Sequence, residues 1–69
     1  MKTQKLSSDA ISLYAALKDL ANDLPGGSTT YLDLAESLAQ IYGARSRAAC
    51  EELERAGKIV LHETYVEVK

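Results

Sequence analysis

Apolar side chains recur every three or four positions in the first third of the chain, which is the spacing of one face of an α-helix. The pattern predicts a helix over residues 8–24, capped by Ser7 or Ser8 and with Asp9 favourably placed in its first turn. The segment 24–27, Leu-Pro-Gly-Gly, ends it because proline cannot continue a helix. The predicted buried face comprises Ala10, Leu13, Tyr14, Leu17, Leu20, Ala21 and Leu24.

Two β-branched residues, Thr29 and Thr30, predict a brief strand before a second helix over residues 30–41. Thr30 would cap this helix and Asp33, three residues on, would complete a capping box. Gly43 marks the following turn. The predicted buried residues are Tyr31, Leu34, Ala35, Leu38 and Ala39, with Tyr42 beyond them also on the apolar side.

The stretch GARSRAACEELERAG predicts a third helix over residues 45–56, which begins at Arg45 or Ser46 and ends before Gly57. Its apolar positions have helical spacing, and Cys50 lies among them, so we interpret this thiol as a small buried hydrophobic group. The predicted buried residues are Ala49, Cys50, Leu53 and Ala56.

After Gly57 the apolar period changes from three-four to two, which predicts strands at 58–62 and 64–68. A turn centred on His62 and Glu63 would join them, although a four-residue loop with the same register is an equal alternative. The predicted pairs are Ile59–Val66, Val60–Tyr65 and Lys58–Glu67. The predicted core-facing residues are Ile59, Leu61, Thr64, Val66 and Val68, with Tyr65 on the outer face, where it could make an intermolecular contact.

Together these elements predict an α+β fold, in which a three-helix bundle is followed by a C-terminal β-hairpin. The chain of 69 residues is expected to form a single domain at 8–69, preceded by a flexible arm at 1–7. One core cluster is expected to contain Leu17, Leu34, Leu38, Leu53, Ile59 and Val66.

Composition narrows the class of protein. The apolar fraction of 46% is typical of a globular chain, and no apolar run approaches the ~18 residues of a membrane-spanning helix. A single cysteine cannot form an internal disulfide, which fits a reducing cytoplasm. The net charge of −2 weighs against non-specific affinity for nucleic acid, although a local basic patch remains compatible with it.

The order helix, short strand, helix, helix, hairpin resembles the winged helix-turn-helix family of DNA-binding domains over residues 8–69. YLDLAESLA is similar to the second helix of that family, and LERAGKIV is similar to its passage from the third helix into the wing. The resemblance implies a transcriptional regulator whose third helix enters the major groove of double-stranded DNA while the hairpin acts as a wing. It implies DNA contacts by Arg45, Ser46 and Arg47 in the third helix, by Lys58 and His62 in the wing, and by Lys2 and Lys5 in the arm.

Other classes of function remain open from the sequence. A winged-helix domain can instead dock on a protein partner or on a second copy through its helices or wing, and an RNA-binding role is a third hypothesis. No serine, histidine and acid set, no glycine-rich phosphate loop and no cluster of metal ligands is present, so the sequence predicts no enzyme, no cofactor and no metal. His62 is accordingly interpreted as a loop residue.

Overall fold

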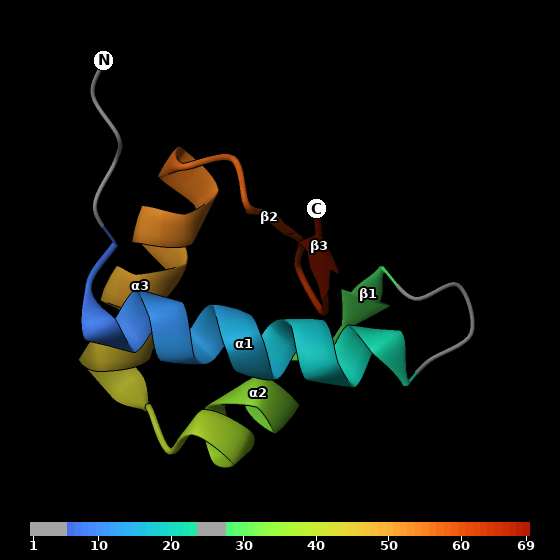
Figure 1. The fold of residues 1–69 in the computed structure, drawn as a ribbon, viewed down its shortest axis with the longest axis horizontal. Helices are drawn as coiled ribbons and strands as arrows, with labels where there is room; N and C mark the ends of the chain where they lie inside the picture. The colour runs from blue at the N-terminus through green and yellow to red at the C-terminus, as the bar shows by residue number, and fades with distance from the viewer. Residues whose placement is uncertain (1–5, 24–27) are drawn as a thin grey trace.

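The computed structural model describes residues 6–23 and 28–69, and within them three helices and three short strands follow one another (Figure 1). The elements are α1 (Ser8–Asn22), β1 (Thr29–Thr30), α2 (Leu32–Ala39), α3 (Gly43–Arg55), β2 (Ile59–Leu61) and β3 (Val66–Val68). This order confirms the predicted α+β architecture of three helices and a C-terminal hairpin.

Helix α1 begins where the sequence predicts. Ser7 is the N-cap, and its Oγ accepts a hydrogen bond from the backbone N–H of Ala10 at 3.1 Å. The helix ends at Asn22, with Asp23 as its C-cap. The predicted extension to Leu24 and the predicted role of segment 24–27 lie outside the described residues.

The predicted start of the second helix is wrong by two residues. Thr30 lies in β1 opposite Val66, and its extended backbone cannot also form the first turn of a helix. Tyr31 is therefore the N-cap of α2 and makes no side-chain capping hydrogen bond, so the predicted capping box of Thr30 and Asp33 is absent. The helix ends at Ala39, and Gln40 follows in a left-handed conformation with φ 60°.

The buried face of α2 also differs from the prediction. Ala35 is fully buried, and Leu32 and Ala39 pack partly against the core. Leu34 and Leu38 are 49% and 55% exposed, so their predicted place in the core is wrong. Small residues on the inner side allow α2 to lie close to α1, and the larger leucines are left on the surface. Tyr31 and Tyr42, also predicted on the apolar face, are more than half exposed.

Helix α3 begins at Gly43, two residues before the earliest predicted start. Residues 40–42 separate it from α2, so the connection is as short as the predicted one over residues 42–44 but lies two residues earlier in the chain. Gly43 has φ +61°, a backbone conformation that glycine adopts without strain. On the inner side of α3, Ala49, Cys50 and Leu53 are buried as predicted.

The hairpin forms, but its register is shifted by two residues from the prediction. Ile59 pairs with Val68, Val60 with Glu67, and Leu61 with Val66. The predicted pair of Lys58 and Glu67 is therefore wrong; instead Lys69 donates its backbone N–H to the carbonyl of Lys58 at 2.9 Å. A shift of two keeps each side chain on the same face, so Ile59 and Val66 are buried as predicted, whereas Thr64 lies in the exposed loop.

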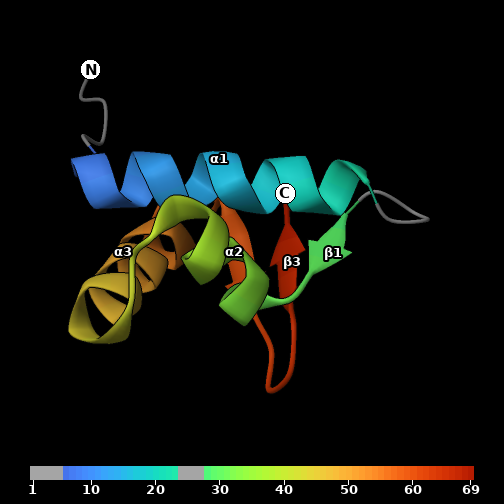
Figure 2. The ribbon, with the colours of Figure 1, turned by 90° about the horizontal axis from the view of Figure 1, so that it is seen from below.

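Strand β3 is the centre of the antiparallel sheet, whose order is β1-β3-β2. Helix α1 lies on one side of the molecule, with α2, α3 and the sheet on the other, and the hairpin loop projects away from α1 (Figure 2). Leu13, Leu17, Leu53, Ile59 and Val66 are the largest apolar side chains that are fully buried between these layers.

The predicted arm at residues 1–7 is held to the domain at its end. Leu6 packs against the core, and the backbone N–H of Ser7 donates to Glu52 Oε1 of α3 at 2.7 Å. Residues 1–5 lie outside the described part of the chain.

Leu53 and Leu38 both follow the apolar spacing of a helix, but their contributions to the free energy of unfolding should differ sharply. Leu53→Ala should lower the free energy of unfolding by about 2–4 kcal/mol because it empties a fully buried site. Leu38→Ala should change it by less than about 1 kcal/mol because that side chain is 55% exposed. Urea denaturation followed by circular dichroism measures both. Equal losses would show that Leu38 lies in the core after all.

Candidate functional site

Arg45, one of the predicted DNA contacts, is engaged within the domain. Its Nη2 and Nε donate to Asp9 Oδ1 and Oδ2 of α1 at 2.8 and 3.0 Å, a bidentate ion pair. These hydrogen bonds are the main cause that holds the pKa of Asp9 below its ordinary value. The pair links the start of α3 to the first turn of α1, so Arg45 has a structural role.

Ser46 is buried, with 1% of its surface exposed, and cannot face a groove of DNA as the resemblance implied. It lies on the inner side of α3 with Cys50, which is 3% exposed. Burial is the main cause that raises the pKa of the Cys50 thiol, and the carboxylates of Glu36, Glu54 and Glu51 add to this effect against the opposing effect of the Ser46 hydroxyl.

The outer face of α3 combines small and charged side chains. Ala44, Ala48, Glu51 and Arg55 follow the three-four spacing of one exposed helix face, and Arg47 is exposed beside them. Among the described residues, neither Arg47 nor Arg55 forms an ion pair. The outer face of α3 therefore presents two guanidinium groups with free hydrogen-bond donors.

Lys58 does not extend along the hairpin. Its Nζ lies 5.9 Å from the centre of the Tyr14 ring of α1, and Lys18 Nζ lies 5.4 Å from the same ring. The Tyr14 hydroxyl donates to the carbonyl of Lys69 at 3.2 Å. Lys58 thus belongs with Lys18 to a basic surface around α1, at the end of the hairpin opposite its loop.

His62 begins the hairpin loop and helps to order it. Its backbone N–H donates to the carbonyl of Tyr65 at 2.9 Å, and the two rings stack with centres 4.3 Å apart. Its Nε2 lies 3.4 Å from Glu67 Oε1. The remaining predicted contacts, Lys2 and Lys5, lie outside the described residues.

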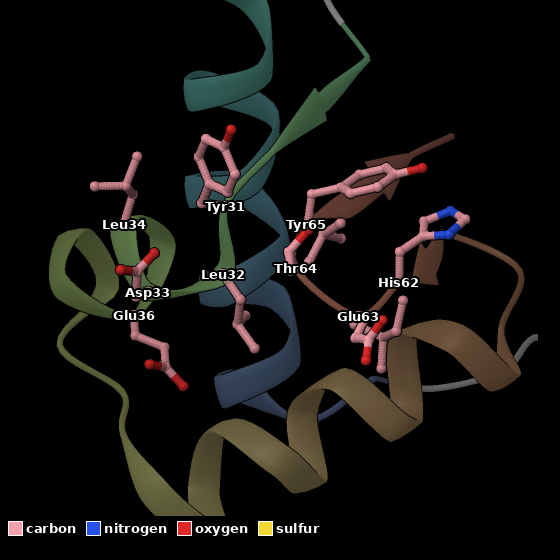
Figure 3. A pocket seen from close by; sticks show the side chains of 11 residues that line it. Tyr31, Leu32, Asp33, Leu34, Glu36, His62, Glu63, Thr64 and Tyr65 are labelled. Carbon is pink, nitrogen blue, oxygen red and sulfur yellow. The ribbon is translucent and has the colours of Figure 1, made fainter.

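A groove made of two adjoining pockets lies beside α2, one facing the hairpin loop (Figure 3) and the other facing α3. One part, of about 630 Å³, lies between α2 and the hairpin loop, and the other, of about 840 Å³, lies between α2 and α3. The two parts share Leu32, Glu36 and Leu61. In Figure 3, Leu32 points into the space between α2 and the hairpin, whereas Leu34 points away from it.

The charge of this groove is strongly acidic. Among the described residues none of its carboxylates forms an ion pair, and Arg47 is the single arginine or lysine in the lining. Glu54 also accepts a hydrogen bond from the backbone N–H of Leu61, at 3.4 Å. We call it the acidic groove; its five carboxylates are Asp33, Glu36, Glu51, Glu54 and Glu63.

The acidic groove is not recognisable from the sequence because its charges come from three separate elements. Asp33 and Glu36 lie on α2, Glu51 and Glu54 on α3, and Glu63 in the hairpin loop. The one local signal was the run of glutamates in the third helix. Recognising the groove required knowing that α2 and the hairpin loop are neighbours.

No known protein family, curated protein or solved structure matches this chain. In the part of the chain that the structure describes, no helix is long and apolar enough to cross a membrane. Within the same residues, no group of three histidine, cysteine, aspartate or glutamate side chains gathers to hold a metal ion.

The Asp9–Arg45 ion pair should make stability depend on pH. Because the pKa of Asp9 is lowered in the folded state, the pair stabilises the protein above the unfolded pKa of about 3.9, and this contribution is lost as the pH falls through the folded pKa. Asp9→Asn should therefore be less stable than wild type near neutral pH, and the gap should close in acid. Urea denaturation across pH measures this, with Asp19→Asn, an exposed change on the same helix, as control. A difference in the free energy of unfolding between wild type and Asp9→Asn that is the same at every pH would contradict the role of the ion pair.

Burial and the raised pKa should make Cys50 unreactive in the folded protein. We expect iodoacetamide near neutral pH to alkylate it at least roughly a hundredfold more slowly in the native state than in urea, because reaction requires opening of the core. Mass spectrometry of timed samples measures the two rates. Comparable rates would show that the thiol is accessible from the groove.

Proposed function

We propose that this chain is a small cytoplasmic DNA-binding protein of the winged helix-turn-helix type, acting in transcription regulation. The observation that carries the proposal is the outer face of α3, where Arg47 and Arg55 are exposed and unpaired among the described residues. The arrangement of three helices with a β1-β3-β2 sheet supports the same type of domain. The single, buried cysteine fits a reducing compartment.

The chemistry of this face suits the major groove of DNA. Ala44 and Ala48 have short side chains, so the helix backbone can approach the base edges closely. Arginine can pair bidentately with guanine or with a phosphate, and glutamate can accept a hydrogen bond from the amino group of cytosine. Arg47, Arg55 and Glu51 would supply these contacts, while Arg45 would set the position of α3 through its pair with Asp9.

The alternative function is a winged-helix module that docks on protein without binding DNA. The acidic groove favours it, because a duplex centred on α3 would bring phosphates towards Glu36, Glu54 and Glu63. The two functions differ in one measurable property, which is affinity for duplex DNA at low salt.

Fluorescence anisotropy with a mixed-sequence duplex at two salt concentrations tests the proposal. Arg47→Ala with Arg55→Ala should weaken binding at least about tenfold and flatten the log–log salt dependence by about two units, since each lost phosphate contact removes about one. Glu51→Gln should strengthen non-specific binding by relieving repulsion of phosphate.

Lys18→Ala with Lys58→Ala is the matched control, because it removes the same charge from the basic surface around Tyr14 of α1 and leaves the outer face of α3 unchanged. We expect its affinity to stay close to that of wild type. Wild-type protein without measurable affinity at low salt would overturn the proposal and favour the protein-docking module. A double arginine variant that binds like wild type would remove α3 from the interface.

A further inference from the structure

The acidic groove has an apolar floor beneath its charged rim. Leu32 of α2 and Leu61 of β2 are partly buried against the core and line both parts of the groove. Tyr31 and Tyr65, which are 53% and 39% exposed, stand on its α2 side and its hairpin side. A side chain entering between them would exchange water for leucine and tyrosine surface, which is favourable for an aliphatic or aromatic group.

Contacts within the hairpin itself hold the hairpin side of the groove. The four-residue loop is closed by the hydrogen bond from the His62 N–H to the Tyr65 carbonyl and by the stacking of the two rings. On the α3 side, Glu54 holds the backbone of Leu61. Because these contacts already hold both sides of the groove, little conformational entropy would be lost in ordering the groove when a partner binds.

The charges of the rim determine the chemistry of the partner. Within the described parts of the chain, five carboxylates and a single arginine line the groove, so a negatively charged ligand would be repelled and a cationic one attracted. Glu36 of α2, Glu54 of α3 and Glu63 of the hairpin loop line the groove together with Leu32 and Leu61. This pattern complements a segment that carries lysine or arginine on either side of a large apolar residue.

We propose that the acidic groove is a docking site for a cationic amphipathic segment of a partner protein. An aliphatic or aromatic side chain of the segment packs over Leu32 and Leu61, flanked by Tyr31 and Tyr65. Its lysine or arginine side chains pair with the carboxylates of the rim. This site overlaps the outer face of α3, because Ala44, Arg47 and Glu51 line the groove as well, so a bound segment hinders a duplex from reaching α3.

Titration of ¹⁵N-labelled protein with a synthetic peptide tests the site directly. The probe is an amphipathic helix-forming peptide of leucine and lysine, compared with an analogue in which glutamate replaces each lysine. We expect chemical-shift changes at Leu32, Glu36 and Leu61 with the lysine peptide at low salt, and none there with the glutamate peptide. No change at these residues with the lysine peptide would overturn the proposal, as would equal changes with both peptides.

Matched variants distinguish binding at the groove from a general effect of the protein's net charge. Glu36→Gln with Glu54→Gln should weaken the lysine peptide at least about tenfold, while glutamine at position 54 still offers an acceptor to the Leu61 N–H. Asp19→Asn with Asp23→Asn makes the same change of charge at two exposed positions, one in α1 and one at its C-cap, and should alter affinity less than about twofold. If both double variants weakened the peptide equally, the binding would depend only on net charge, and the proposal would be overturned.

Self-association is the remaining outcome, because Lys18 and Lys58 of a second copy could meet the groove. Analytical ultracentrifugation of the wild-type chain without peptide should show a monomer. Concentration-dependent association abolished by Lys18→Ala with Lys58→Ala would assign the groove to a second copy and overturn the partner proposed here. These measurements contain no DNA, so the proposed docking site and the proposed DNA binding can each fail without the other.

Discussion

The pairing of a two-residue strand with the hairpin is the constraint on which the arrangement of the domain depends. Thr30 of β1 lies opposite Val66 of β3, and both are almost completely buried. Only Tyr31 separates this strand from α2, so the orientation of α2 about its own axis has little freedom. It turns Leu32 and Ala35 inward and leaves Leu34 outside. The same pairing holds the hairpin beside α2, and without it the acidic groove would have no second wall.

A second set of contacts, which are polar, adds to the apolar packing of α3 in setting its orientation. Arg45 pairs with Asp9, and Glu52 accepts from the backbone of Ser7, so the first turn of α1 is bound to α3 at two points. With this side of α3 held against α1 and Leu53 in the core, the side through residues 44, 48, 51 and 55 must face solvent. The exposure of Arg47 and Arg55 therefore follows from contacts made by other residues of the same helix.

The sequence predicts the features that local spacing determines and not those that depend on distant partners. The three helices, the hairpin and the burial of Leu53 and Val66 follow from apolar period. The inner face of α2 does not, because leucines lie on two sides of this helix and nothing local distinguishes Leu32 from Leu34. The hairpin register is ambiguous for a related reason, since a shift of two residues leaves every side chain on the same face.

The candidate site was less accessible to sequence reasoning than the fold. A basic pair at the start of the third helix suggests two equivalent cations, but Arg45 meets Asp9 from 36 positions earlier in the chain, and Arg47 does not. Similarly, no stretch of sequence contains the acidic groove, because α2, α3 and the hairpin loop each supply part of it. Charge partners that are remote in sequence become visible only when the fold is known.

The net charge of −2 is not spread evenly over the molecule. Five carboxylates line the acidic groove, whereas Lys18 and Lys58 gather around Tyr14, and neither lysine lines the groove. At physiological ionic strength the screening length is about 8 Å, and the domain measures 36 × 26 × 20 Å. Charges on well-separated surfaces are thus largely screened from one another, and a partner responds to the local surface rather than to the total. The outer face of α3 borders the groove, so the balance between its arginines and the neighbouring glutamates decides which sign of partner can approach.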